Sequence, residues 1–112
     1  MILITGLTGY IGSHIATCFD KKKINYIGID NLSYSYKSNI KNKHKLVICN
    51  ISDKTKINML FKKYKIKTVI HTAAYSYVLE AEKMSKIYKN NNEIKTKKFI
   101  DICNKNNVEK FI

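Results

Sequence analysis

Residues 1–14, MILITGLTGYIGSH, decide the fold of this 112-residue chain. The short apolar run at the N-terminus is typical of a strand that is covered on both faces. Three glycines, Gly6, Gly9 and Gly12, follow it at a spacing of three, and an amphipathic stretch begins directly after them. Between a strand and a helix, such glycines allow a tight turn, close approach of the backbone to a pyrophosphate, and close packing of the helix on the strand. The N–H groups that start the helix would attract the phosphates.

Strands and helices alternate along the rest of the chain. Apolar runs predict further strands at 24–30, 46–50, 68–74 and 109–112, and helical spacing predicts helices at 10–23, 52–66 and 84–108. The polar segment 31–45 reads as a loop. Alternating strands and helices form parallel sheets with right-handed crossovers. We therefore predict an α/β fold, a Rossmann-like parallel sheet of order 3-2-1-4 with a truncated fifth strand beside the fourth, in one domain over residues 1–112.

An acidic residue, Asp30, ends the second predicted strand about 20 residues after the glycines. In dinucleotide-binding folds a carboxylate at this place accepts hydrogen bonds from the adenosine ribose. It would also repel the 2′-phosphate of NADP, and Asn31 rather than a lysine follows it. The pattern predicts a site for NAD. The alternative, that the glycines only make a turn and Asp30 only caps a strand, leaves the spacing between them unexplained.

The net charge of +13 raises a second hypothesis, a basic module that binds nucleic acid. However, all 21 basic residues are lysines, and they are spread along the chain. Arginine, which makes the bidentate contacts to guanine and phosphate, is missing. This composition favours a solvated lysine-rich surface over a nucleic-acid partner.

The cysteines and histidines form no recognisable motif. Cys18, Cys49 and Cys103 lie far apart without a CxxC pair, so we expect buried thiols and no metal site. His14 should pack or hydrogen-bond locally, and His71 should be a core histidine at the end of a strand. The sequence shows no signal peptide and no run long enough to span a membrane, so we expect a cytoplasmic protein that does not bind membranes.

Five segments resemble the UDP-glucose 4-epimerases, a branch of the extended short-chain dehydrogenase/reductase family. They are TGLTGYIGSH (5–14), IDNLSYS (29–35), KTVIHTAAYSYVLEA (67–81), YKNNN (88–92) and NNVEKFI (106–112). The resemblance covers essentially the whole chain and implies NAD as cofactor. It implies that the pyrophosphate, the adenosine and the remainder of the cofactor are lined by Gly6, Gly9, Tyr10, Ile11, Gly12, Asp30, Asn31, Ser35, Asn50, Ile51, Thr72, Ala73, Ala74 and Asn92.

The chain also departs from the family pattern. Asn50 stands where the family has an aspartate, Leu79 and Ala81 flank Glu80 in place of Gly and Ser, and Lys95 replaces a glycine. The family's catalytic tyrosine and lysine form a YxxxK pair, and no tyrosine of this chain has a lysine four residues later.

The resemblance therefore implies the N-terminal NAD-binding portion of a UDP-glucose 4-epimerase, an enzyme of galactose metabolism that interconverts UDP-glucose and UDP-galactose. The substrate domain is absent, so the resemblance implies that this portion is inactive by itself. The alternative is the NAD-binding part of another nucleotide-sugar epimerase or dehydratase that is assembled with a second polypeptide.

Overall fold

The computed structural model describes all residues from Met1 to Ile112. Its centre is a five-stranded sheet with the order β3-β2-β1-β4-β5, and every pair of neighbouring strands is parallel. The strands are β1 (Ile2–Thr5), β2 (Tyr26–Asp30), β3 (Leu46–Ile48), β4 (Thr68–His71) and β5 (Lys110–Phe111). The predicted fold class, the strand order and the short fifth strand are confirmed. Each strand is shorter than its apolar run, by up to three residues.

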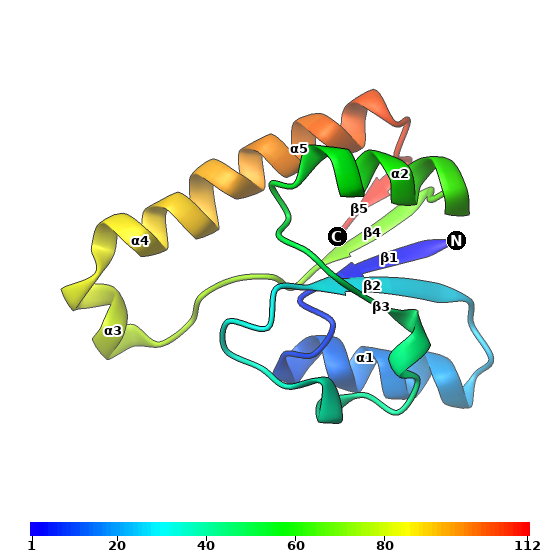
Figure 1. Ribbon diagram of the computed structural model, residues 1–112, viewed down its shortest axis with the longest axis horizontal. Helices are drawn as coiled ribbons and strands as arrows, with labels where there is room; N and C mark the ends of the chain where they lie inside the picture. The colour runs from blue at the N-terminus through cyan, green and yellow to red at the C-terminus, as the bar shows by residue number, and fades with distance from the viewer.

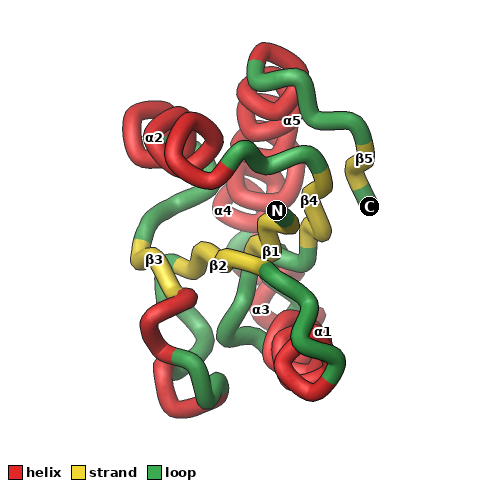
Figure 2. The backbone as a smooth tube through the Cα atoms, turned by 90° about the vertical axis from the view of Figure 1, so that its right-hand side faces the viewer, coloured by secondary structure: helices red, strands yellow, loops and turns green.

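Helices cover both faces of the sheet, as Figures 1 and 2 show. On one face lie α2 (Lys54–Tyr64) and α5 (Thr96–Lys105), and on the other lies α1 (Tyr10–Lys21). The long connection between β4 and β5 also contains α3 (Val78–Lys83), α4 (Ser85–Lys89) and a π-helical segment, η3 (Asn90–Lys95). Two 3₁₀ turns, η1 (Lys37–Asn39) and η2 (Lys43–Lys45), lie in the loop after β2.

The larger core lies between the sheet and the α2–α5 layer. Thirteen buried side chains form it, with Leu3 of β1 and Phe99 of α5 fully inaccessible. The helix α2 contributes the apolar face that its spacing predicts, and the Asp53 carboxylate caps it by accepting a hydrogen bond from the backbone N–H of Lys56 at 3.1 Å.

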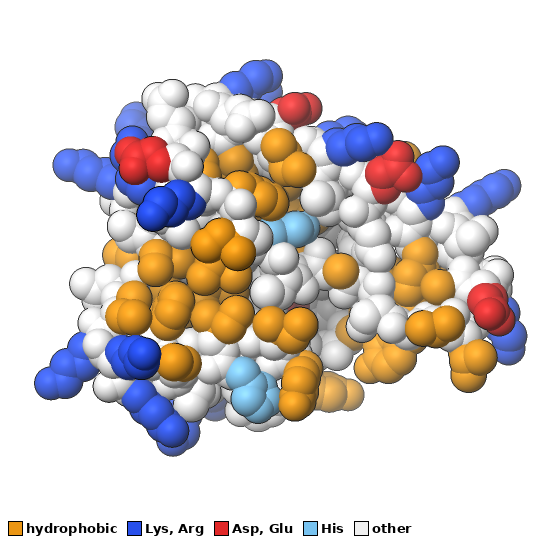
Figure 3. Space-filling model, turned by 180° about the vertical axis from the view of Figure 1, so that it is seen from behind, with side chains coloured by type: hydrophobic (Ala, Val, Ile, Leu, Met, Phe, Trp, Pro, Cys, Tyr) orange, Lys and Arg blue, Asp and Glu red, His pale blue; other side chains and the backbone are white.

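The opposite face is less completely covered, because only α1 and the loop after β2 pack on it. Five buried residues form this smaller core, and Ile15, Phe19 and Ile70 at its border are partly exposed. Hydrophobic side chains accordingly gather in one broad area of the rear face, while lysines lie around its rim (Figure 3). No helix is both long enough and apolar enough to cross a membrane.

One local expectation was wrong. Cys18 is exposed, because it lies on the side of α1 that faces away from the sheet, whereas Cys49 and Cys103 are buried as expected. Burial raises the pKa of the Cys49 thiol to about 11 and that of Cys103 to about 12. The sequence patterns assigned no element to the region of α3, a six-residue helix that has no buried face and therefore no apolar periodicity to reveal it.

Candidate functional site

The register of the sheet brings three strand ends together. Thr5 at the end of β1 pairs with Ile29 of β2 on one side and with His71 of β4 on the other. The segments that follow these three strands therefore leave the sheet at the same edge. In open α/β sheets this edge, at the carboxyl ends of the strands, is where ligands bind.

The glycine turn after β1 is shaped by contacts that exclude side chains. Gly6 has φ +69°, and a Cβ atom there would lie 2.8 Å from the backbone nitrogen of Ala73. A Cβ atom on Gly12 would overlap the carbonyl oxygen of Gly6 and lie 3.0 Å from the Cα atom of Leu7. The tight turn and the close packing of helix on strand that the sequence predicts are both present.

Gly9 differs from its two neighbours in the motif. It is the N-cap residue of α1 with an ordinary φ of −68°, and a Cβ atom there would meet only the carbonyl oxygen of Gly6, at 3.3 Å. The first N–H groups of a helix have no acceptor within the helix. The turn thus presents unpaired backbone donors beside an open space, which suits an anion.

Asp30 ties the glycine turn to the loop after β2. Its Oδ2 atom accepts a hydrogen bond from the backbone N–H of Thr8 at 3.0 Å. Its Oδ1 atom accepts from the N–H of Leu32 at 2.8 Å and from the Ser35 hydroxyl at 3.2 Å. A carboxylate has about four acceptor positions, so three donors leave room for one more. The residue is 8% exposed, so the remaining acceptor position is available to a hydroxyl donor in the cavity.

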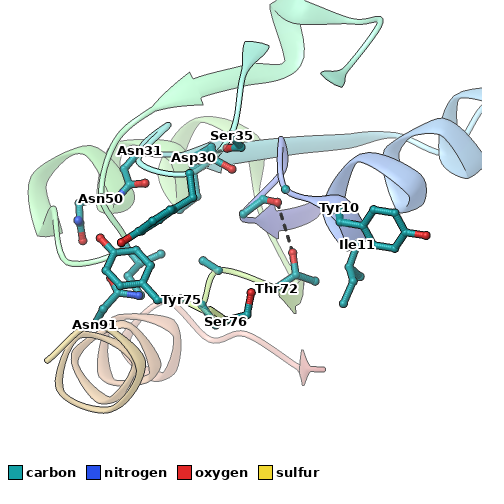
Figure 4. Close-up of a pocket in the computed structure, with 18 of the residues that line it drawn as sticks. Tyr10, Ile11, Asp30, Asn31, Ser35, Asn50, Thr72, Tyr75, Ser76 and Asn91 are labelled. Carbon is teal, nitrogen blue, oxygen red and sulfur yellow. Dashed lines mark hydrogen bonds between the residues drawn. The ribbon is translucent and has the colours of Figure 1, made fainter. Parts of the chain in front are cut away.

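A cavity of about 400 Å³ opens at this edge of the sheet. Thirteen of the fourteen residues that the sequence singles out line it, all except Asn92. Figure 4 shows Asp30, Asn31 and Asn50 grouped on one wall, with Tyr75 and Asn91 facing them. The sequence did not indicate six further lining residues, which are Ile29, Tyr34, Tyr75, Ser76, Tyr77 and Asn91.

Asn92 lies next to the cavity and holds its wall. Its side-chain amide accepts a hydrogen bond from the N–H of Tyr75 at 2.9 Å and donates one to the carbonyl oxygen of Tyr75 at 2.8 Å. The neighbouring Asn91 is buried and lines the cavity instead. Both residues belong to the π-helical segment, where the wider turn changes which side chain faces the sheet.

Asn50 keeps one free hydrogen-bonding group. Its Oδ1 atom accepts from the backbone N–H and the hydroxyl of Ser52, at 3.1 and 2.9 Å. Its Nδ2 group has no acceptor in the protein, and Asn50 lines the cavity together with Asn31. An amide here offers two donors to a ligand and carries no charge.

The segment after β4 is fixed by hydrogen bonds to the end of β1. The Thr72 hydroxyl donates to the carbonyl oxygen of Thr5 at 2.7 Å and lies 3.4 Å from that of Gly6 (Figure 4). The backbone N–H of Ala73 donates to the Thr5 hydroxyl at 3.3 Å. These bonds hold the chain from Thr72 to Ala74 against the glycine turn.

Neither histidine is placed for chemistry in the cavity. The two ring nitrogens of His71 lie 2.7 Å from the Thr5 hydroxyl and 3.2 Å from the Thr96 hydroxyl, and burial lowers its pKa. His14 is exposed, with its Nδ1 atom 2.7 Å from the carbonyl oxygen of Tyr10. Both histidines are hydrogen-bonded as expected, but His71 is half-buried at the end of its strand rather than fully in the core.

Three of the six lining residues that sequence reasoning missed are tyrosines. Tyr34 follows β2, and Tyr75 and Tyr77 follow β4. The pKa of Tyr34 is raised, mainly because its hydroxyl is hydrogen-bonded to the Glu80 carboxylate and to a smaller extent because of burial. Burial and a hydrogen bond to the same carboxylate raise the pKa of Tyr88 to about 12. One available signal was the presence of aromatic residues in polar segments that follow two strands of the same sheet.

Comparison with known proteins places the fold and the site in context. The family model described as the NAD dependent epimerase/dehydratase family matches residues 2–112. A dTDP-D-glucose 4,6-dehydratase of Dictyostelium discoideum is 38% identical, in an alignment that covers 99% of this chain and 27% of the dehydratase. A UDP-glucose 4-epimerase of Drosophila melanogaster is 31% identical, with 99% of this chain and 35% of its own length covered.

Solved structures agree with these relatives. A crystal structure of a UDP-glucose 4-epimerase, 29% identical, superimposes with a TM-score of 0.93 over 98% of this chain and 33% of its own. The UDP-glucose 4-epimerase of Brucella ovis in complex with NAD is 30% identical, with a TM-score of 0.86 over 94% of this chain and 32% of its own. The chain thus spans about a third or less of the length of these proteins. Because the family model matches all but the first residue, the chain belongs to the NAD dependent epimerase/dehydratase family.

Proposed function

We propose that residues 1–112 form the NAD-binding domain of an enzyme that acts on a nucleotide sugar. The observation that carries the proposal is the convergence of the glycine turn, the start of α1 and the Asp30 carboxylate on one cavity. These are the three elements that a dinucleotide needs for its pyrophosphate and its ribose. The bound NAD in the Brucella ovis relative supports the choice of ligand.

The cavity suggests a role for each of its walls. The turn at Gly9, with Tyr10 and Ile11 at the start of α1, would hold the pyrophosphate. Asp30, with Asn31 and Ser35 beside it, would hold the adenosine ribose. The adenine would lie by Asn50 and Ile51, the chain from Thr72 to Ala74 would run along the cofactor, and Asn92 would act indirectly by fixing Tyr75.

Asp30 supports NAD over NADP. The carboxylate is nearly buried, and three donors hold it in place, so it cannot turn away from a 2′-phosphate. Bringing a phosphate against a fixed carboxylate in a partly desolvated site is strongly unfavourable. Asn31 supplies no positive charge to compensate.

Two reactions remain candidates for the enzyme as a whole. UDP-glucose 4-epimerisation is our first choice, because the Drosophila relative and the two crystal structures carry that name. Dehydration of a nucleotide-linked glucose is the second, because the Dictyostelium dehydratase is 38% identical. Both names describe glucose joined to a nucleoside diphosphate, so the substrate class is the same.

Catalysis needs residues that lie outside 1–112. No tyrosine here is followed by a lysine four residues later, and no side chain at the cavity pairs a tyrosine with a lysine. We infer that residues 1–112 bind the cofactor without turnover. The catalytic tyrosine and the substrate domain would come from the remainder of the same polypeptide or from a second one.

Turnover and cofactor preference test this function. The purified chain is incubated with NAD and either UDP-galactose or dTDP-glucose, alone and with the catalytic half of a relative added. We expect no turnover by the chain alone, and a larger rise in melting temperature with NAD than with NADP. Turnover by the isolated chain above that of a Gly9→Ala control would contradict the inferred inactivity, and an equal shift with NADP would contradict the role of Asp30.

A further inference from the structure

Two residues far apart in the sequence meet at the rim of the cavity. Tyr34 lies in the loop after β2, and Glu80 lies in α3, 46 residues later. The Tyr34 hydroxyl is 2.9 Å from each oxygen of the Glu80 carboxylate. Tyr88 of α4 donates to the same carboxylate at 2.7 Å. The Glu80 carboxylate therefore accepts hydrogen bonds from two tyrosines, from Tyr88 in the neighbouring helix and from Tyr34 across the rim of the cavity.

Aromatic contacts support this bond. The ring centre of Tyr34 lies 4.8 Å from that of Tyr75, edge to face, and 5.4 Å from that of Tyr77. All three rings line the cavity. Tyr34 is nonetheless 45% exposed, so the contact lies at the surface and can open without disturbing the core.

Sheet topology makes this contact a bridge. In the order β2-β1-β4, the strands β2 and β4 are not neighbours, and β1 with its glycine turn lies between them. Any contact between the segments that follow β2 and β4 therefore passes over the end of β1. Figure 4 shows the two walls, with Asn31 and Ser35 on the side of β2 and Tyr75 and Ser76 on the side of β4.

We propose that Tyr34 and Glu80 form a strap across the nucleotide cavity that must open before a nucleotide enters or leaves. The inference rests on the proposed function, because it concerns the same cavity. The strap is closed in this structure, and its hydrogen bond to a charged group is of the stronger kind. It therefore acts on the rates of exchange.

A gate and a ligand contact leave different kinetic signatures. In this proposal the strap is closed in the free protein and closes again over the bound ligand. The free energy of the closed strap then contributes equally to the free and bound states, so it leaves the dissociation constant unchanged. It still adds to the barrier for entry and exit of the nucleotide. Removing it should raise the association and dissociation rate constants by the same factor. A residue that only touches the ligand would change the dissociation rate constant alone.

The experiment measures both rate constants by stopped flow, with NADH fluorescence as the readout. Tyr34→Phe keeps the ring contacts and removes the hydrogen bond, and Glu80→Gln removes the charge that accepts it. The matched controls are Tyr36→Phe, on a side chain that is 74% exposed and has no hydrogen bond, and Glu82→Gln, on an exposed glutamate without an ion pair. We expect both rate constants to rise about threefold to tenfold in the two strap variants and to stay unchanged in the controls.

Hydrogen exchange without nucleotide gives an independent readout. The strap variants should exchange faster than the controls in segments 31–39 and 75–83, because their tether is lost. Unchanged exchange and unchanged rate constants, or a rise in the dissociation rate constant alone, would overturn the strap. If the wild-type chain binds no NADH but exchange still rises in the strap variants, the strap stands as a closed bridge and the proposed NAD site is what fails.

Discussion

Gly9 and Gly12 should fail in different ways when each is changed to alanine. The methyl group of Gly12→Ala would overlap the carbonyl oxygen of Gly6 and crowd the Cα atom of Leu7 at 3.0 Å. Both obstacles are backbone, so α1 must move away from β1. Overpacking of this kind costs about 1–3 kcal/mol or more. Gly12→Ala should therefore lower the free energy of unfolding.

Gly9→Ala should leave the fold intact and weaken the binding of NAD. Its methyl group has one neighbour, the Gly6 oxygen at 3.3 Å, and its φ of −68° suits any residue. Loss of a glycine N-cap costs about 0.5–1 kcal/mol. The methyl group would, however, stand where the pyrophosphate approaches the backbone. Loss of one or two hydrogen bonds to a charged group, about 1.5–3 kcal/mol each, weakens binding by at least about tenfold.

Urea denaturation and calorimetric titration with NAD separate the two effects. We expect Gly9→Ala to unfold close to the wild-type midpoint and to bind NAD at least about tenfold more weakly. We expect Gly12→Ala to unfold at a clearly lower urea concentration. Undiminished NAD affinity in Gly9→Ala, or wild-type stability in Gly12→Ala, would refute the division of labour among the glycines.

Four further predictions follow from the contacts. Asp30→Asn places an amide donor against backbone N–H groups, so it should cost about 1–3 kcal/mol of stability and narrow the preference for NAD over NADP, as denaturation and titration with both cofactors would show. The pKa of Asp20 lies below its usual value of 3.8: burial alone would raise this pKa, but hydrogen bonds from Lys45, Asn42 and Tyr26 outweigh burial. The stability that Asp20 adds relative to Asp20→Asn should therefore be complete above pH 3.8 and shrink as the pH falls further, in acid denaturation of both proteins. A maleimide should label Cys18 in the native chain and the two buried cysteines only after unfolding, as mass spectrometry of the digested protein would show. The lysine-rich surface should show only weak, salt-sensitive retardation of DNA or RNA in gel shifts, and tight binding at 200 mM salt would revive the nucleic-acid hypothesis.

Local signals in the sequence were enough for the sheet, the glycine turn and Asp30. The glycine spacing, the alternation of strands and helices and the acidic end of β2 each depend on neighbouring residues. The order of a parallel sheet then follows from general rules of handedness. This is why the turn from Gly6 to Gly12 and Asp30 could be located from local patterns. Asn31, Ser35 and the chain from Thr72 to Ala74 were located only through the family resemblance.

The remaining features depend on tertiary contacts. The approach of Tyr34 to Glu80 joins positions 46 residues apart, and neither residue has a local pattern that marks it. The placement of Asn91 in the cavity and Asn92 behind it depends on the π-helical turn, which consecutive asparagines do not reveal. The exposure of Cys18 depends on how α1 is turned about its axis when it packs on the sheet, and the apolar spacing of α1 alone did not fix that rotation.

The most direct test of the central claim is a calorimetric titration of the purified 112-residue chain with NAD, run beside a check by circular dichroism that the chain is folded. We predict a saturable heat with one NAD per chain at ligand concentrations up to the millimolar range, and a weaker response to NADP. A folded chain that gives no saturable heat with millimolar NAD would contradict the assignment of this cavity as a dinucleotide site.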